Sequence, residues 1–305
     1  MIKEKFILFV RLARLHYPLP ILFLYLPCLW GLMLFEKVTF LKVHGNSDDV
    51  HLILQWMMER SGDFIHSALL FAMGAVATRS SGCIFNDLCD VQFDQKVQRT
   101  KDRPLASGCI SRNEAWGACL FFLIISGAVW LLLPFAAKCM SLFGLVLLFL
   151  YPYAKRFLKV PQLILGLAFN MGVLVSIAFV DSSLLRFSHV WLLYGVGICW
   201  TLYYDTLYAL QDVEDDRGLG IGSSALFFEK HLKLALSLFY TSMTVLMAVL
   251  GYLLQADVWF YVALLLGIVW DIGVEVRRFD PKDPKKAKHM FHYAILLGVG
   301  ILFLI

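Results

Sequence analysis

The sequence predicts an all-α polytopic membrane protein with about nine transmembrane helices. Of its 305 residues, 60% are hydrophobic and 16% are charged, and a soluble fold of that composition would expose more apolar surface than it can bury. Apolar runs of about 16 to 22 residues recur along the chain, and a helix of about 20 residues crosses the roughly 30 Å hydrocarbon core of a bilayer. Short segments that hold most of the charge separate these runs. We therefore expect one membrane domain over residues 1–305.

Each apolar run is long enough for one span. The expected spans are residues 18–35, 64–84, 115–133, 140–153, 162–180, 189–208, 234–254, 258–274 and 290–305. The fourth run is short, and Pro152 and Pro161 flank the connection after it, which favours a kink or an interfacial segment there. Residues 36–63 are expected to form a fairly long first loop. The basic N-terminal segment has no small-residue cleavage site, so we expect a juxtamembrane helix there.

The distribution of Lys and Arg predicts the orientation of the spans. With the N-terminus inside, the cytoplasmic segments hold 21 of the 27 basic residues, the opposite side holds 5, and Arg79 lies within the second span. Cytoplasmic loops of membrane proteins carry the excess of positive charge. The bias places the N-terminus in the cytoplasm and the C-terminus outside. With no clear transit peptide, it favours a multi-pass protein of a bacterial inner membrane over a mitochondrial one.

Charge and cysteine content exclude other classes of protein. The net charge of +4 is scattered over several loops, which argues against nucleic acid as a partner. The seven cysteines lie mostly in or beside apolar runs, and no pair has CxxC spacing. We therefore expect small apolar fillers and neither a structural zinc site nor a disulfide framework.

The connection after the second span carries the first of two acidic clusters. Asn86, Asp90 and Asp94 are spaced at i, i+4 and i+8, which places them on nearly one face if the second span continues as a helix. Three stacked oxygen-bearing side chains weaken a helix unless a hard cation or a cationic partner lies among them.

The connection after the sixth span carries the second cluster. Asp212 and Asp216 repeat the i, i+4 spacing, and Asp205 lies two turns before Asp212 on a similar face. The two connections together hold 10 of the 23 acidic residues and are expected on the same side of the membrane. Because Mg²⁺ is commonly held by one or two carboxylates plus substrate phosphate oxygens, the clusters predict a site for a Mg²⁺-bound diphosphate.

Basic side chains on the same side would complete a diphosphate site. The candidates are Arg99, Arg103, Lys155 and Arg156. Arg79 lies deeper, and a guanidinium within a span usually faces a polar cavity or an anionic partner. Taken singly, an Asp at a span end is more often a solvated headgroup-region charge, and Lys155 with Arg156 is also explained as a positive-inside anchor. Solvation gives no reason for two acidic ladders bordered by basic residues.

At these residues the sequence resembles the UbiA-type intramembrane aromatic prenyltransferases, and within them the 4-hydroxybenzoate polyprenyltransferases of ubiquinone biosynthesis. The family's NDxxDxxxD stretch and the following RTxxRPLxSG match residues 86–94 and 99–108. Its YPxxKRxxxxPQxxLG segment matches residues 151–166, and its YDTxYAxxDxxDD motif matches residues 204–216. The similarity extends over most of the chain, and the segments together are highly specific.

The resemblance implies nine transmembrane helices around a central cavity open to lipid, with Mg²⁺ held by the two acidic motifs. Matched position by position, the implied metal set is Asn86, Asp90, Asp94, Asp212 and Asp216. The diphosphate would be held by Arg99, Arg103, Lys155 and Arg156. The implied catalytic residues are Asp90, Asp94, Asp212, Asp216 and Arg156. Candidates for the acceptor pocket are Arg14, Arg79 and Asp205.

The sequence departs from the family pattern outside the metal set. The departures stand at His16, Tyr17, Pro20, Met171, Leu174 and Gly222. The first three follow the retained Arg14, and Gly222 stands where a lysine usually follows the second acidic motif. These changes leave the metal ligands in place and make the identity of the acceptor the open question.

The predicted reaction is Mg²⁺-dependent transfer of a polyprenyl group from a polyprenyl diphosphate to the ring carbon ortho to the hydroxyl of 4-hydroxybenzoate. The metal and the basic residues would stabilise the departing diphosphate while the ring attacks the allylic cation. Two alternatives stay open: a prenyltransferase of the same fold with another acceptor, and a membrane transporter that uses the acidic clusters, which would favour acidic residues near mid-span. Prenyl chain length, oligomeric state and the general base are not determined by the sequence.

Overall fold

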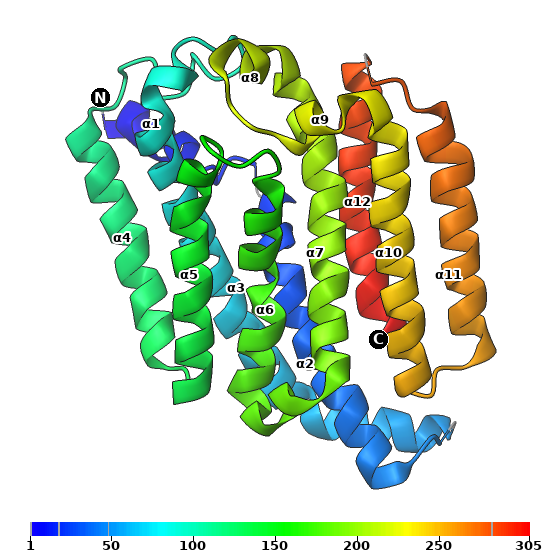
Figure 1. Cartoon of the computed structure of the whole chain (residues 1–305). Helices are drawn as coiled ribbons and strands as arrows, with labels where there is room; N and C mark the ends of the chain where they lie inside the picture. Colours follow the sequence, from blue (N-terminus) through cyan, green and yellow to red (C-terminus); the bar gives the residue numbers. More distant parts are fainter. Residues whose placement is uncertain (1, 18, 48, 282) are drawn as a thin grey trace.

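The computed structural model is a bundle of helices, and its described residues, 2–17, 19–47, 49–281 and 283–305, contain no strand (Figure 1). The long helices within these residues are α2 (Leu22–His44), α3 (Val50–Asp94), α4 (Arg112–Leu131), α5 (Phe135–Ala154), α6 (Gln162–Asp181), α7 (Ser188–Ala209), α10 (Leu232–Leu253), α11 (Val258–Trp270) and α12 (Pro284–Leu304). Shorter elements connect them: α1 (Ile2–Leu12), η1 (Leu19–Ile21), η2 (Ser182–Arg186), η3 (Leu210–Asp212), α8 (Val213–Leu219), α9 (Ser224–Phe227), η4 (Glu229–His231) and η5 (Asp271–Val276).

Eight of the described helices are long and apolar enough to cross a membrane, and each coincides with a predicted span. They are Leu19–His44, Val50–Asp94, Arg112–Leu131, Phe135–Ala154, Gln162–Arg186, Glu229–Leu253, Val258–Val276 and Lys286–Leu304. The ninth expected span, residues 189–208, forms α7, which has 22 residues but is made less apolar by its Tyr, Thr and Asp residues. Residue 18, the expected start of the first span, lies outside the described residues.

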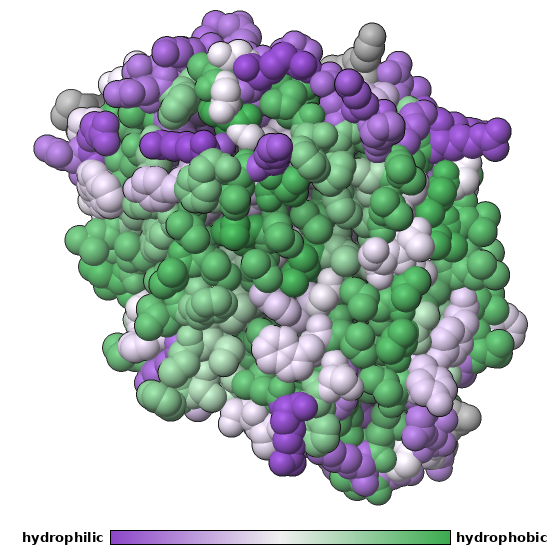
Figure 2. Space-filling view, in the orientation of Figure 1, coloured by the Kyte–Doolittle hydropathy of each residue, from purple (hydrophilic) through white to green (hydrophobic). Residues whose placement is uncertain are grey.

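The surface of the bundle has the pattern of a protein in a bilayer. Figure 2 shows hydrophobic side chains across the middle of the face in view and hydrophilic side chains gathered at its two ends. On α11, at the edge of the bundle in Figure 1, Trp259, Leu265 and Val269 are exposed. Large apolar side chains in a band between two polar ends are expected where lipid replaces water.

The expected first loop and the expected length of the fourth span are both wrong. Residues 36–63 are largely helical and not a long loop, because α2 continues to His44 and α3 begins at Val50. With 45 residues, α3 is roughly 68 Å long at 1.5 Å per residue, so it projects beyond the other helices (Figure 1). The fourth span is also longer than predicted, since α5 has 20 residues with Pro152 inside its last turn. The predicted N-terminal helix is confirmed as α1.

Aromatic side chains pack α2, α7 and α12 together, beside the cavity described below. The ring of Phe23 stacks on that of Tyr204 with centroids 3.9 Å apart, and Trp30 lies 5.0 Å from Trp200. Both tryptophans donate hydrogen bonds to carbonyl oxygens of α12, 2.9 Å from Trp30 and 2.7 Å from Trp200. Because buried indole N–H groups need partners, these bonds fix α12 against the centre of the bundle.

Candidate active site

A cavity of about 600 Å³ opens at one end of the bundle. We call this the acidic end, because Asp94 of α3, Asp212 of η3 and the helix α8 lie there. Side chains from α2, α3, α5, α6 and α7 form its walls, and the segments 97–103 and 221–223 close its rim. Its apolar lining includes Leu148, Leu165 and Phe169, so the cavity joins a charged mouth to an apolar interior.

The first acidic set is placed as the spacing predicts. Since α3 runs without a break to Asp94, Asn86, Asp90 and Asp94 share one face, and all three line the cavity. Cations lie among them: Arg103 is 2.8 Å from Asp94, and Lys155 is 3.7 Å from Asp90. The cationic partners that this ladder requires are therefore supplied by the chain itself.

One carboxylate of the site, Asp87, is absent from the predicted set. It is 1% exposed and accepts hydrogen bonds from Arg14 at 2.8 Å and from Arg103 at 3.1 Å. Arg14 was expected in the acceptor pocket, and although it lines the cavity, its guanidinium is engaged by Asp87. The signal in the sequence was its spacing, since Asp87, Asp90 and Asp94 stand at i, i+3 and i+7 and so share nearly one face of a continuing helix.

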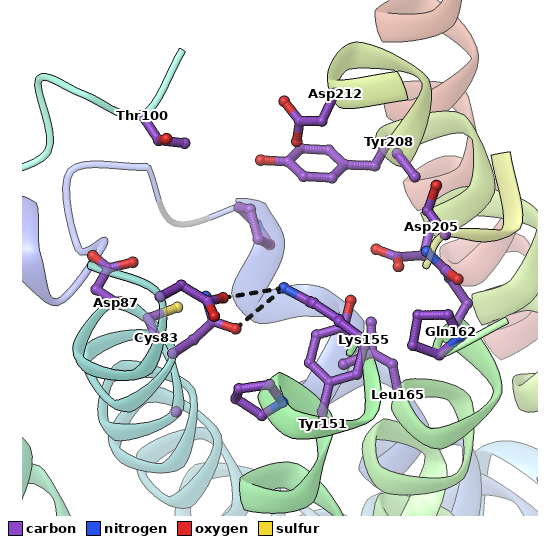
Figure 3. A pocket seen from close by; sticks show the side chains of 18 of the residues that line it. Cys83, Asp87, Thr100, Tyr151, Lys155, Gln162, Leu165, Asp205, Tyr208 and Asp212 are labelled. Atoms are coloured by element: carbon purple, nitrogen blue, oxygen red, sulfur yellow. Dashed lines mark hydrogen bonds and ion pairs between the residues drawn. The ribbon is translucent and has the colours of Figure 1, made fainter. Parts of the chain in front are cut away.

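The second acidic set lies across the cavity from the first (Figure 3). Asp205, Asp212 and Asp216 all line the cavity, but they do not lie on one regular helix. The chain ends α7 at Ala209 and passes through the 3₁₀ turn η3 before α8 begins. The expected i, i+4 ladder of Asp212 and Asp216 is thus interrupted at its first member, which has φ −116° and ψ 5°.

Electrostatics differ between Asp212 of η3 and Asp216 of α8. Arg99 donates to Asp212 at 2.7 Å and to the hydroxyl of Tyr208 at 3.2 Å, so the charge of Asp212 is balanced. Burial and the neighbouring carboxylate of Asp212 raise the pKa of Asp216 to about 6. Because these effects disfavour its charged form, Asp216 would be stabilised by an added cation.

Lys155 lies between the two acidic sets (Figure 3). Its Nζ donates to Oδ1 of Asn86 at 3.3 Å and lies 4.8 Å above the ring centroid of Tyr151. Figure 3 shows it reaching from the end of α5 towards α3, with Asp205 and Asp212 on the opposite wall. An anion that enters the cavity would therefore be close to this ammonium group, whichever acidic set it approaches.

Arg79 provides a cation deeper in the cavity. It lines the cavity beside Phe169, whose ring centroid is 5.8 Å from the guanidinium carbon. One Nη contacts the sulfur of Cys83, and Nε is buried without a hydrogen-bond partner among the described residues. A buried guanidinium N–H without an acceptor is rare in folded proteins, so Arg79 offers a place for an anionic ligand.

Eleven of the twelve predicted site residues line the cavity. The exception is Arg156: α5 ends at Ala154, Lys155 turns inward, and Arg156 donates to the carbonyl oxygen of Cys89 at 3.1 Å. It contacts the site through Oδ1 of Asp90, 3.7 Å away, and through the ring of Phe93, whose centroid is 5.5 Å from its guanidinium carbon. Among the departures from the family pattern, four line the cavity: His16, Tyr17, Pro20 and Gly222. Met171 and Leu174 are instead buried in the core, 4% and 2% exposed.

The donor set fits a metal that is shared with a ligand. No three His, Cys, Asp or Glu side chains of the described residues converge closely enough to hold a metal ion by themselves. The walls nevertheless supply carboxylate and amide oxygens, which are the ligands that Mg²⁺ prefers, and Mg²⁺ often takes its remaining ligands from substrate phosphates. The arrangement suits Mg²⁺ brought in with an anionic ligand.

Comparison with known proteins agrees with the fold and the motifs. Residues 50–298 match the UbiA prenyltransferase family. A protein of Francisella tularensis subsp. novicida named 4-hydroxybenzoate octaprenyltransferase is 35% identical over 264 residues, which cover 87% of this chain and 84% of that protein. A protein of the same name from Legionella pneumophila is 34% identical over 297 residues, covering 97% and 95% of the two chains.

Solved structures share the architecture. A UbiA homolog from Aeropyrum pernix K1 superposes with a TM-score of 0.68 at 23% identity, covering 92% of this chain and 94% of that one. A UbiA homolog from Archaeoglobus fulgidus bound to GPP and Mg²⁺ has a TM-score of 0.67 at 17% identity, covering 97% and 98%. These likenesses concern the fold.

Proposed function

This chain belongs to the UbiA prenyltransferase family, and on that premise we propose that it transfers a polyprenyl group from a polyprenyl diphosphate to the ring carbon ortho to the hydroxyl of 4-hydroxybenzoate, as a Mg²⁺-dependent step of ubiquinone biosynthesis. The names of its relatives support the acceptor and the activity, a 4-hydroxybenzoate polyprenyltransferase. The observation that carries the proposal is the position of Lys155 between two acidic sets at the mouth of one cavity.

The mouth of the cavity would bind the diphosphate of the donor. Mg²⁺ would be held by oxygens from Asn86, Asp90, Asp94, Asp212 and Asp216, where it supplies positive charge to the oxygens of the leaving diphosphate. Lys155, Arg99 and Arg103 now pair with carboxylates. Because the diphosphate and its metal bring both charges, these cations can exchange a carboxylate partner for a phosphate oxygen without being left unpaired.

The chemical step is a substitution at the first carbon of the prenyl chain. Its bond to the diphosphate oxygen breaks with both electrons remaining on the diphosphate, and the ortho ring carbon forms the new carbon–carbon bond. The same ring carbon then gives its proton to the released diphosphate, which restores the aromatic ring. Lys155, Arg99 and Arg103 stabilise the charge that develops on the leaving group, which is where preorganised cations accelerate a reaction most.

The interior of the cavity would bind the acceptor. The Nε of Arg79 has no hydrogen-bond partner among the described residues, and the aromatic ring of Phe169 lies beside it. A benzoate carboxylate bound to Arg79 would direct the ring towards the mouth, and Asp205 would face it from α7. Arg14 is already paired with Asp87, so we assign the carboxylate to Arg79.

The membrane location suits the donor. Burial of apolar surface contributes about 25 cal/mol per Å², so a polyprenyl tail stays in the bilayer. The apolar interior of the cavity would receive the first isoprenoid units, and the rest of the tail would extend into lipid. Exclusion of bulk water protects the allylic cation from hydrolysis. We place the acidic end at the cytoplasmic side of a bacterial inner membrane. We also propose that the whole chain forms one domain.

Reconstituted protein tests this proposal directly. Labelled 4-hydroxybenzoate and a polyprenyl diphosphate, with and without Mg²⁺, should give a prenylated product that Asp90→Ala and Asp212→Ala abolish. Asp63→Ala, an exposed change at the other end of α3, is the matched control and should retain activity. Folded protein that neither prenylates nor releases diphosphate would reject the enzyme assignment.

A different acceptor is the second candidate. Four departures from the family pattern, at residues His16, Tyr17, Pro20 and Gly222, lie on the cavity wall, where they can alter what binds beside the donor. Mg²⁺-dependent release of diphosphate without a prenylated benzoate would support this reading and keep the donor site. The transporter alternative gains nothing from the structure, since both acidic sets lie at one end of the bundle.

A further inference from the structure

Two backbone segments meet closely beside the cavity, at Gly222 and at the turn after α5. The N–H of Gly222 donates a 2.8 Å hydrogen bond to the carbonyl oxygen of Lys155. A Cβ built on Gly222 would overlap the carbonyl oxygen of Leu158 and lie 3.0 Å from its carbonyl carbon. Backbone atoms cannot swing aside as the end of a long side chain can, so only glycine permits this approach.

The segment that contains Gly222 is also held from its other side. The N–H of Ser224 donates to Oε1 of Gln162 at 2.9 Å, and the hydroxyls of Ser224 and Thr206 are 2.7 Å apart. Gln162 opens α6, and Thr206 follows Asp205 on α7. Since Ser224 and Thr206 are 0% exposed, this segment is a fixed support against which the turn after α5 rests.

The conformation of the turn after α5 determines that the side chain of Lys155, and not that of Arg156, points into the cavity. The side chain of Lys155 points inward to Asn86, whereas that of Arg156 lies outside and binds the carbonyl oxygen of Cys89. Neighbouring side chains diverge widely around a helix end. A small rotation of this turn would therefore withdraw the ammonium group from between the acidic sets.

We propose that Gly222 is a positioning residue, which holds the turn after α5 in the one orientation that presents Lys155 to the anionic donor. The inference rests on the proposed function, because the donor is taken to be a Mg²⁺-bound prenyl diphosphate. It also explains the glycine at a position where the family pattern has a lysine. A side chain at residue 222 has no room here unless the 155–158 turn moves, and Lys155 with it.

The test compares Gly222→Ala with Gly218→Ala in the full-length protein. Gly218 lies in α8, outside the cavity lining, and a Cβ built on it meets nothing within 4 Å, so it controls for an added methyl group in the same connection. Calorimetry in detergent measures binding of geranyl diphosphate with Mg²⁺, and thermal unfolding verifies that each variant is folded. We expect Gly222→Ala to weaken binding about tenfold, the effect of losing one charge-assisted hydrogen bond, and Gly218→Ala to bind as wild type does.

A double-mutant cycle separates positioning from a general loss of structure. If Gly222 acts through Lys155, adding Gly222→Ala to Lys155→Ala should weaken binding no further than Lys155→Ala alone. Hydrogen exchange should also rise at the amide of residue 222 in Gly222→Ala and stay slow in Lys155→Ala. Additive losses, or equal binding by Gly222→Ala and Gly218→Ala, would overturn the inference.

Failure of the donor site and misfolding of Gly222→Ala are distinguished from loss of positioning. Failure of the wild-type protein to bind the Mg²⁺-bound diphosphate would reject the donor site itself, whatever Gly222 does. If Gly222→Ala does not fold, Ser224→Ala loosens the same support by removing its hydroxyl contact with Thr206. Weaker binding by Ser224→Ala that disappears in the Lys155→Ala background supports the inference, and unchanged binding contradicts it.

Discussion

The Nη2 atom of Arg14 donates to both carboxylate oxygens of Asp87, at 2.8 and 3.0 Å, across 73 residues of sequence. Arg14 adopts a φ of 58°, a left-handed conformation that residues other than glycine rarely adopt. The ion pair joins the segment before α2 to the helix that carries the first acidic set. A second cation, Arg103, links the same carboxylate to Asp94, so Asp87 organises the mouth of the cavity without belonging to the metal set.

Removing Asp87 should destabilise the folded protein. In Asp87→Ala, Arg14 and Arg103 lose a shared, buried partner, and removing one member of such a pair lowers the free energy of unfolding by about 3 kcal/mol. Equilibrium unfolding in mixed micelles measures the change. Lys5→Ala breaks an ion pair whose side chains are 71% and 51% exposed and serves as control, with a much smaller effect. Equal effects of the two changes would contradict the role given to Asp87.

Arg156 should act on the metal through Asp90. Its guanidinium lies outside the cavity, 3.7 Å from Oδ1 of Asp90, so Arg156→Ala removes a group that orients a proposed ligand. We expect the Mg²⁺ concentration for half-maximal activity to rise about tenfold, as for other residues that orient metal ligands, with partial rescue by Arg156→Lys. Lys155→Ala should instead raise the KM for the prenyl diphosphate. If both variants change only the diphosphate KM, Arg156 contacts the donor directly.

Local signals predicted the spans and the first acidic set. Hydropathy depends on composition over one helix, and the spacing of Asn86, Asp90 and Asp94 defines a face wherever the helix continues. Hydropathy does not mark where a helix ends outside the bilayer, which is why the helical residues 36–44 and 50–63 were expected as a loop. The 3₁₀ turn at Asp212 was missed for a similar reason, because spacing alone assumes a regular helix.

Contacts between segments that are far apart in the sequence could not be predicted from one sequence. Asp87 lies on nearly the same helix face as Asp94, but its partner Arg14 is 73 residues away, so no spacing rule predicts their contact. The restriction on Gly222 comes from the backbone of Leu158, and the opposite directions of Lys155 and Arg156 come from the end of α5. Each depends on where helices meet, and tertiary packing sets that geometry.

Donor binding should strengthen as pH rises through about 6. Burial and the carboxylate of Asp212 raise the pKa of Asp216 to about 6, so Asp216 takes up a proton below that pH and loses the charge that attracts Mg²⁺. Calorimetric titration of geranyl diphosphate with Mg²⁺ from about pH 5 to about pH 7 should show this rise. In Asp216→Asn, binding should be weaker and that component of the pH dependence should vanish. The same pH dependence in the variant would assign the titration to another group.

Arg79 should determine affinity for the acceptor and leave the donor unaffected. Its buried Nε has no hydrogen-bond partner among the described residues, and it lies on α3 about two turns before Asn86, which belongs to the mouth of the cavity. Arg79→Ala removes the charge that a benzoate carboxylate would meet, so we expect the KM for 4-hydroxybenzoate to rise about tenfold or more while the KM for the prenyl diphosphate stays within about twofold. Arg79→Lys keeps the charge and should recover part of the affinity. Cys83→Ala removes the sulfur beside the guanidinium and controls for altered packing, with little change expected in either KM. An equal rise of both KM values in Arg79→Ala would show that this guanidinium supports the whole cavity and does not recognise the acceptor.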